Sequence, residues 1–343
     1  MIAPLGTLEF TRLPAANEPQ ERAAPLLVLI PVFDDWEALQ LLLPRIDAAL
    51  HAHGLTAEIL VVDDRSPRPH QGLLQLAKKS ALERVDVLEL ARNLGHQRAI
   101  AVGLAWIRDN RPTRTVVICD GDGEDDPRDI PRLLEHFDAA GQRKIVFAAR
   151  ARRSEHWTFQ VGYRAYQLAH VILTGQRVRV GNFSVVPPRA VARLAVISEV
   201  WNHYAAAVFN SRLEFDTLPT ARGKRLGGAS RMNFTALVVH GLSALSVFSH
   251  VIGVRLLVAT VGLICGVFVG FSIGLGVEAL DGRPMPPWTP VLMGLLAALL
   301  LQQAIVATSF VLLVLGNRQG ASFIPIREYR YFVAHITNVY CQP

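Results

Sequence analysis

Three carboxylates lie close together immediately after an apolar run. Asp120, Asp122 and Glu124 occupy alternate positions after Val116–Cys119, so their side chains can approach one divalent cation from a single turn. Carboxylate oxygens select Mg²⁺ or Mn²⁺, which usually keep several waters and also bind substrate phosphates. A solvated acidic turn that holds no metal is the alternative interpretation.

A calcium loop of the EF-hand type also begins with alternating acidic residues, and here it would start at Asp120. Such a loop requires glycine at its sixth position and a bidentate glutamate at its twelfth. This sequence has Asp125 and Pro131 at those two positions. The pattern therefore argues against an EF-hand and leaves a magnesium or manganese site.

The elements that would position these carboxylates are short apolar runs alternating with helical patterns. We predict strands at Leu26–Ile30, Ile59–Val62, Val85–Leu88, Val116–Cys119, Ile145–Ala148 and Val180–Val186. We predict helices at Trp36–Ala52, Gly72–Lys79, Gln97–Arg108, Ile130–Phe137, Phe159–Leu173 and Met232–Val254. This alternation is typical of an α/β domain with a mostly parallel sheet covered by helices.

In open sheets of this kind, ligands bind beyond the carboxyl ends of the strands. The first strand runs into Pro31–Asp35, the second into Asp63–Ser66, and the fourth into Asp120–Pro127. Negative charges at one edge repel each other unless a cation or a ligand lies between them. We therefore expect the site at this edge.

Two long segments near the C-terminus carry no charge. Leu256–Val277 and Val291–Leu315 each exceed the roughly 20 residues that cross a bilayer core. Two transmembrane helices are the predicted interpretation, and a pair of buried core helices is the alternative. Residues 1–24 do not resemble a secretory signal, so the N-terminal domain is expected in the cytoplasm.

The chain has three widely spaced cysteines, Cys119, Cys265 and Cys341. This usage fits a reducing compartment and argues against a disulfide framework or a zinc site.

The net charge of +6 is unevenly distributed, because no Asp or Glu occurs between Thr217 and Val277. The cations of this stretch are Arg222, Lys224, Arg225, Arg231 and Arg255. A basic cluster beside a membrane span suits anionic headgroups or a lipid phosphate. No recognition module accompanies the charge, so we expect no nucleic-acid partner. The loop from Glu278 to Trp288 lacks the positive excess of cytoplasmic loops, which predicts both termini inside.

Four segments in order carry a resemblance to a known family. They are Leu29–Asp35, Ile59–Ser66, Ala91–Ala99 with Gly103 and Leu104, and Asp120–Pro131. Together they resemble the inverting glycosyltransferases of family 2 with the GT-A fold. The branch is that of dolichyl-phosphate mannose synthases and bacterial undecaprenyl-phosphate sugar transferases. The resemblance covers about residues 25 to 255 of this chain.

The resemblance implies roles for individual residues. Donor-binding positions are Pro31, Phe33, Asp35, Asp63, Asp64, Asn93, Gly95, Asp120 and Gly121, with Asp63 reading the base. The metal ligands are Asp120, Asp122 and Glu124, and the catalytic group is Asp122 with the phosphate-binding Arg150 and Arg164. A solvated basic loop that includes Arg152 and Arg153 is the alternative for these two arginines.

The basic segment before the membrane is a predicted lipid-phosphate site, because it lies between the catalytic domain and the hydrophobic anchor. Its residues are Arg222, Lys224, Arg225, Ser230 and Arg231. Its glycines would let backbone N–H groups approach an anion. A general anchoring cluster that binds bulk anionic lipid is the alternative.

Some positions depart from the family pattern. Arg65 stands where glycine is usual, Glu124 where glutamine is common, and Asp34 where asparagine often occurs. Residues 181–184, Gly-Asn-Phe-Ser, replace an aspartate-rich stretch. The nucleotide of the sugar donor therefore stays open between UDP and GDP.

The predicted function is inverting transfer of a hexose from a nucleotide-sugar to a polyprenyl phosphate, giving a lipid-linked sugar for cell-envelope glycosylation, with Mg²⁺ or Mn²⁺. A processive or other membrane glycosyltransferase is one alternative, and a non-catalytic scaffold or flippase partner is another. The expected location is the inner membrane, in contact with membrane lipid, and the oligomeric state is open between a monomer and a homo-oligomer.

The predicted architecture is a GT-A domain followed by interfacial and transmembrane helices. Its boundaries are an N-terminal arm at 1–24, the catalytic domain at 25–231, juxtamembrane helices at 232–255, a transmembrane helix at 256–277, an extracytoplasmic loop at 278–290, a transmembrane helix at 291–316 and a cytoplasmic tail at 317–343.

Overall fold

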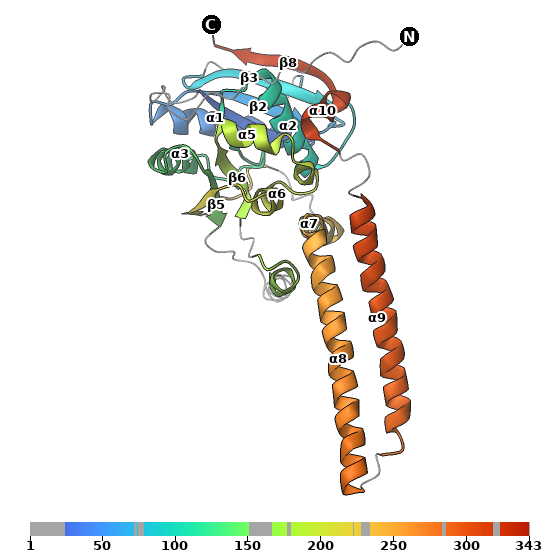
Figure 1. Ribbon diagram of the computed structural model, residues 1–343. Helices are drawn as coiled ribbons and strands as arrows, with labels where there is room; N and C mark the ends of the chain where they lie inside the picture. Colours follow the sequence, from blue (N-terminus) through green and yellow to red (C-terminus); the bar gives the residue numbers. More distant parts are fainter. Residues whose placement is uncertain are drawn as a thin grey trace, which may run out of the picture.

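The computed structural model describes residues 25–342 except 72–73, 75–78, 151–166, 177–179, 222, 228–233, 283–285 and 318–322. An α/β domain carries two long helices that extend away from it side by side (Figure 1). Residues 159–166 and most of the helix expected at Gly72–Lys79 lie outside the described part of the chain. Residues 167–174 are helical.

The described strands form one eight-stranded sheet in the order β7-β5-β6-β4-β1-β2-β3-β8. Their bounds are β1 Leu26–Val32, β2 Ala57–Asp63, β3 Leu82–Leu90, β4 Thr115–Ile118, β5 Ile145–Arg150, β6 Val180–Val186, β7 Phe215–Thr220 and β8 Val333–Cys341. Strands β4, β1, β2 and β3 are parallel neighbours, β5 is parallel to β7, and β6 and β8 run antiparallel to their neighbours. The mostly parallel α/β sheet predicted from the sequence is confirmed.

Helices cover both faces of this sheet. The α-helices are α1 Trp36–His51, α2 His96–Asn110, α3 Asp129–Ala139, α5 Pro188–Leu194, α6 Tyr204–Asn210, α7 Phe234–Ser246, α8 Ser249–Asp281, α9 Thr289–Asn317 and α10 Pro325–Glu328, with 3-10 turns η1 Ser198–Trp201 and η2 Tyr329–Phe332. The helix predicted at Met232–Val254 is interrupted, because α7 ends at Ser246 and α8 begins at Ser249.

The central strand β1 shows why these segments form a two-sided core. All seven of its residues are buried, and alternate side chains enter different clusters because a strand points successive residues to opposite faces. Leu27 and Leu29 pack with α2, whereas Val28 and Ile30 pack with α1. A Cβ at Gly103 would lie 2.5 Å from Cδ1 of Leu29, so glycine lets α2 pack closely on β1.

Helices α8 and α9 are each long and apolar enough to cross a membrane. Their apolar side chains are mostly exposed, as in Phe268 at 70%, Leu280 at 88% and Val291 at 76%. A continuous apolar surface of this extent is unfavourable in water. The exposure therefore favours membrane spans over the alternative of buried core helices.

After α9 the chain returns to the α/β domain. Strand β8 pairs antiparallel with β3, from Arg84 opposite Cys341 to Leu90 opposite Val333. The sequence predicts only a tail for residues 317–343, whereas the structure shows that Val333–Cys341 form an edge strand of the main sheet. The C-terminal strand and the α/β domain therefore lie at the same end of the α8–α9 pair (Figure 1).

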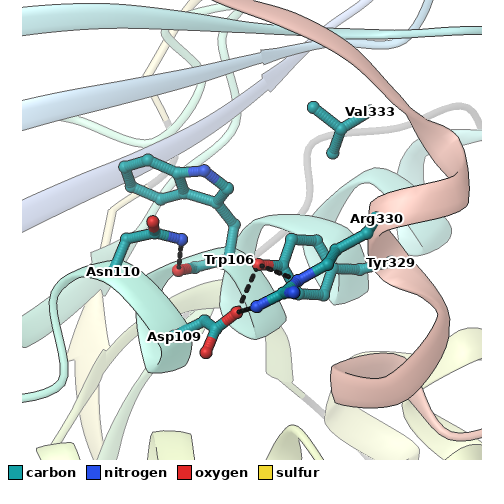
Figure 2. Close-up of a pocket in the computed structure, with 6 residues that line it drawn as sticks. All are labelled: Trp106, Asp109, Asn110, Tyr329, Arg330 and Val333. Carbon is teal, nitrogen blue, oxygen red and sulfur yellow. Dashed lines mark hydrogen bonds and ion pairs between the residues drawn. The ribbon is translucent and has the colours of Figure 1, made fainter.

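A polar contact near the C-terminal end of α2 secures this return. The Tyr329 hydroxyl donates to Oδ2 of Asp109 at 2.7 Å, and Nη2 of Arg330 pairs with the same oxygen at 2.5 Å. These residues line a pocket together with Trp106 and Asn110 (Figure 2). Arg330 and Tyr329 lower the pKa of Asp109 by hydrogen bonding, which keeps its carboxylate charged.

Candidate functional site

The loops after β1, β2 and β4 meet at one edge of the sheet, as expected. The backbone N–H of Asp64 donates to the carbonyl of Val32 at 2.8 Å, and that of Cys119 donates to Leu29 at 3.2 Å. Gly121 lies against this backbone, because a Cβ there would be 3.3 Å from the carbonyl oxygen of Pro31. Phe33 is 41% exposed at the same edge.

Asp120 faces two side chains that are not among the predicted site residues. Its Oδ1 lies 3.2 Å from Nε2 of His96 and 3.4 Å from the Nδ2 of Asn182. Nε2 of His96 also lies 2.9 Å from Nδ2 of Asn182. The backbone N–H of Asp120 donates to Oδ2 of Asp125 at 3.0 Å, which fixes the turn.

A buried amide extends this network. Nε2 of Gln97 donates to Oδ1 of Asn182 at 3.1 Å, while its own Oε1 accepts from the backbone N–H of Tyr204 at 2.7 Å. Asn182 belongs to the 181–184 string that departs from the family pattern, so the sequence contained a signal for it. His96 follows directly after the predicted donor-binding residue Gly95, but only the fold brings it to Asp120.

Asp122 is paired with Arg225, which comes from a distant part of the chain. Oδ1 of Asp122 accepts from the backbone N–H of Glu124 at 3.0 Å, and Oδ2 of Asp122 lies 3.0 Å from Nη1 of Arg225. The other amino group of Arg225 pairs with Asp35. The structure therefore joins a predicted lipid-phosphate residue to the predicted donor-binding Asp35 and the predicted metal ligand Asp122, and the side chains are each only about one-fifth exposed.

Residues 223–227, which we call the strap, lie across the turn that carries Asp122. The N–H of Gly223 donates to the carbonyl of Glu124 at 2.7 Å, and that of Leu226 donates to the carbonyl of Asp122 at 2.9 Å. A Cβ at Gly123 would lie 2.4 Å from Cγ of Leu226, and its φ of 78° also favours glycine. The acidic turn and the strap therefore fit closely against each other.

Several predicted site residues cannot be placed. Arg164, Arg222, Ser230 and Arg231 lie outside the described residues, and Arg150 is described only as the last residue of β5. Their roles remain predictions. Lys224 is described and is exposed on the strap.

Asp63, the predicted base-reading residue, ends β2 and is buried. Its Oδ1 accepts from the backbone N–H of Ser66 at 3.0 Å and from the Ser66 hydroxyl. Burial raises the pKa of Asp63, and the Ser66 hydrogen bonds oppose that rise. Its contact with a base remains a prediction.

Asp64 supports a loop from below. Its two oxygens accept from the backbone N–H groups of Leu94 at 2.6 Å and Gly95 at 2.7 Å. Burial raises the pKa of Asp64 to about 6, and these two bonds oppose the rise. Asp64 therefore positions the loop that carries Asn93 and Gly95, and the φ of Gly95 is 94°. The direct contact of Asp64 with the donor remains a prediction.

Helix α6 and the membrane-proximal helices pack together near this edge. The ring of His203, the N-cap of α6, lies 4.8 Å from the ring of His240 in α7. Burial, followed by the charge of His240, lowers the pKa of His203 to about 3, so His203 is neutral. Ala206, Phe248 and Ile252 share one apolar cluster beside this pair. The contact joins the site-bearing domain to the predicted membrane anchor.

The carboxylates of Asp120 and Asp122 are ligands of the kind that a hard divalent cation prefers. Within the described ranges, no three His, Cys, Asp or Glu side chains converge to hold a metal ion. Mg²⁺ sites commonly use one or two protein carboxylates, together with waters and substrate phosphates. Asp120 and Asp122 can supply the two carboxylates. The Arg225 guanidinium lies between Asp122 and Asp35, so Asp122, one of the two carboxylates, is already paired with a positive charge. Glu124 as a third ligand remains a prediction.

The comparison with known families identifies the class of the protein. The family described as "Glycosyl transferase family 2" matches residues 27–200, just over half of the 343 residues. The chain belongs to this family, which confirms the resemblance predicted from the four motifs. Its sheet followed by two long apolar helices agrees with the predicted GT-A architecture.

Curated relatives of this chain have related names. It is 33% identical over 130 residues to an undecaprenyl-phosphate 4-deoxy-4-formamido-L-arabinose transferase of Edwardsiella ictaluri, covering 38% of each chain. The transferase of the same name from Sodalis glossinidius is 32% identical over the same length, again covering 38% of each chain. The match thus spans well under half of these relatives.

Solved structures also align with the domain. Mannosyl-3-phosphoglycerate synthase from Rubrobacter xylanophilus has a TM-score of 0.46 and 16% identity, covering 65% of this chain and 72% of that one. Glucosyl-3-phosphoglycerate synthase from Mycobacterium tuberculosis, solved with Mn²⁺, UDP and phosphoglyceric acid, has a TM-score of 0.47 and 12% identity, covering 67% and 79%.

Proposed function

We propose that the protein transfers a sugar, expected to be a hexose, from a UDP- or GDP-linked donor to a polyprenyl phosphate with inversion. One observation carries the proposal: a family 2 domain with Asp120 and Asp122 at its ligand-binding edge continues directly into two helices able to span a membrane. The names of the two relatives, which specify undecaprenyl phosphate, support this acceptor class.

The chemistry requires one displacement. A phosphate monoester is largely dianionic at neutral pH, so its oxygen can attack without a general base. The new bond joins that oxygen to the anomeric carbon, the bond from this carbon to the donor diphosphate breaks, and the nucleoside diphosphate leaves. Attack opposite to the leaving group inverts the anomeric carbon.

Different residues of this chain have different roles in that displacement. Asp63 contacts the base, and the carboxylates of Asp120 and Asp122 face the diphosphate. A Mg²⁺ or Mn²⁺ ion, when bound, would supply charge neutralisation for the leaving diphosphate. Arg150 and Arg164 hold phosphate oxygens through charge-assisted hydrogen bonds. Asp64 and the His96–Asn182 pair position these groups.

The proposed topology follows from the return of the chain after α9. If α8 and α9 cross a membrane, the α/β domain and β8 lie on one side and Pro286 lies on the other. The non-basic loop between the helices supports a cytoplasmic location for the domain and both termini in an inner membrane. We retain 25–231 as the catalytic domain and propose that residues 323–342 also belong to it structurally.

The experiment is an assay of the purified full-length protein with radiolabelled UDP- and GDP-sugars, Mn²⁺ and a polyprenyl phosphate. We expect a charged product that partitions into organic solvent and yields the inverted anomer. Pentose donors are included, because the relatives are named for a modified arabinose. A water-soluble polymer would indicate a processive enzyme, and no transfer from any donor would favour a scaffold.

A further inference from the structure

Arg225 is fixed by three contacts at the acidic edge. Its Nη1 lies 3.0 Å from Oδ2 of Asp122, its Nη2 pairs with Asp35, and its Nε donates to the carbonyl oxygen of Gly227 at 2.8 Å. Arg225 and Asp122 are 103 positions apart, and Asp35 comes from a third loop. The planar guanidinium therefore connects two loops of the site through charge-assisted bonds.

The backbone of the strap holds this guanidinium in place. Gly223 and Leu226 each donate an N–H to a carbonyl of the acidic turn, on either side of Arg225. Gly227 lies against α1, because a Cβ there would be 3.3 Å from the backbone nitrogen of Ala38. Arg225 is thus part of the architecture of the site, in contrast to its exposed neighbour Lys224.

This arrangement has an electrostatic consequence for a divalent cation. A positive charge in contact with Asp122 weakens the attraction of that carboxylate for a second cation, since like charges repel strongly where solvent is partly excluded. The diphosphate of a nucleotide-sugar carries two negative charges. It would offset this repulsion and offer oxygens to both the cation and the guanidinium.

Building on the proposed function, we propose that Arg225 makes divalent-cation binding at Asp122 conditional on the nucleotide diphosphate. Arg225 is a positioning residue in this role, because it acts through Asp122. The cation and the nucleotide then bind with positive coupling. By thermodynamic linkage, each tightens the other by the same factor.

The test measures binding rather than turnover. Full-length protein in nanodiscs of zwitterionic lipid is titrated with Mn²⁺ alone, with Mn²⁺ and UDP, and with Mn²⁺ and GDP, while electron paramagnetic resonance reports free Mn²⁺. The variants are Arg225→Gln and Lys224→Gln, which change the net charge equally. Of these two residues, Arg225 is the one that pairs with Asp122, so Lys224→Gln controls for long-range charge.

We expect the wild type to bind Mn²⁺ at least tenfold more tightly with its preferred nucleotide, within the usual range of coupling between ligands. Arg225→Gln should bind Mn²⁺ alone about tenfold more tightly than the wild type and should lose most of the coupling. Lys224→Gln should stay within about twofold of the wild type in both measurements. A gain of affinity distinguishes this role from a structural one, since damage to the site would lower affinity.

Unchanged or weaker binding of Mn²⁺ alone by Arg225→Gln would overturn the inference, and so would an equal gain in Lys224→Gln. If Arg225→Gln unfolds, Arg225→Lys replaces it; lysine presents a point charge that cannot bridge both carboxylates, so a smaller gain is expected and a loss contradicts the inference. Failure of the wild type to bind Mn²⁺ under any condition would refute the proposed function itself, separately from the role of Arg225.

Discussion

The carboxylate of Asp64 accepts the backbone N–H of Gly95 at 2.7 Å across 31 positions of sequence. Because Gly95 precedes the first residue of α2, His96, this bond places the start of that helix beside Asp120. Asp64 is 3% exposed, so the fold keeps a buried charge at this junction. A buried carboxylate costs stability whenever it is ionised, which suggests that it is retained for geometry rather than for stability.

The first prediction concerns the pH dependence of Asp64→Asn. The pKa of Asp64 is raised to about 6, so between about pH 4 and pH 6 the folded state keeps a proton that the unfolded state releases. The stability contributed by Asp64 is therefore present below pH 4 and is lost as the pH rises through 6. Asn cannot titrate, so the variant does not lose this stability. As the pH rises from 4 to 7.5, the free energy of unfolding of Asp64→Asn should increase by about 2 kcal/mol relative to that of the wild type.

Chemical unfolding of both proteins in detergent across this pH range measures the difference, and transfer activity measured in parallel should fall in the variant because Asn cannot accept both N–H bonds. A constant gap between the two unfolding curves at all pH values would mean that the pKa of Asp64 is ordinary.

The second prediction separates Asp122 from a neighbouring carboxylate of the same turn. Asp122→Asn should lower transfer at least about 100-fold without unfolding the protein, because a charged oxygen facing the diphosphate is lost at constant volume. Asp126→Asn is the matched control, since Asp126 instead pairs with the exposed Arg128. It should retain activity within about threefold. Asp120→Asn should resemble Asp122→Asn.

A chelator should abolish activity of the wild type, and added Mn²⁺ should restore it. Wild-type turnover by Asp122→Asn in metal-free buffer would contradict the prediction that Asp122 is a metal ligand.

The sequence was sufficient to predict most of the sheet because β1 to β6 are local apolar runs bounded by turns. It did not predict the two edge strands, β7 and β8. The alternation of β8 is weak, and its partner β3 lies some 250 positions earlier in the chain. Edge strands keep one side exposed, so they need fewer apolar residues to form.

The same limit applies within the site. Asp63 and Asp64 are adjacent, and only the structure shows that Asp64 points to the Leu94–Gly95 backbone. Arg225 was predicted from its charge to contact a lipid phosphate, but sequence distance hides its pairing with Asp35 and Asp122. Long-range polar contacts depend on how loops pack, which composition and periodicity do not encode.

The third prediction tests the attachment of the C-terminal strand. Tyr329→Phe removes the hydroxyl that donates to Asp109 and should destabilise this attachment by about 1.5–3 kcal/mol, as for a hydrogen bond to a charged group. Amide hydrogen exchange in β8 should quicken at least about tenfold while exchange in β1 stays unchanged. Tyr331→Phe is the control, because Tyr331 is 81% exposed. Equal protection of β8 in both variants would show that packing alone holds the strand.

The fourth prediction concerns topology. In a variant whose three native cysteines are replaced by serine or alanine, a cysteine at Pro286 should react with an impermeant thiol reagent added outside the cell. A cysteine at Gln342 should be protected until the membrane is permeabilised, because Gln342 donates its N–H to Glu83 of the α/β domain. Labelling at Gln342 but not at Pro286 would place the catalytic domain outside the cytoplasm.

The last prediction divides the two cations of the strap by their contacts. Lys224 is exposed beside the turn, so Lys224→Ala should raise the apparent Michaelis constant for polyprenyl phosphate about fivefold, equivalent to the roughly 1 kcal/mol of one surface cation near a phosphate. Its constant for the nucleotide-sugar should not change. Arg225→Ala should alter both constants, because Arg225 touches Asp35 and Asp122 on the donor side.

Steady-state kinetics in detergent, where bulk anionic lipid is absent, distinguish acceptor binding from membrane anchoring. Normal acceptor kinetics in Lys224→Ala would assign Lys224 to anchoring alone and remove it from the acceptor site. An Arg225→Ala variant that changed only the acceptor constant would show that its pairing with the carboxylates has no influence on the donor.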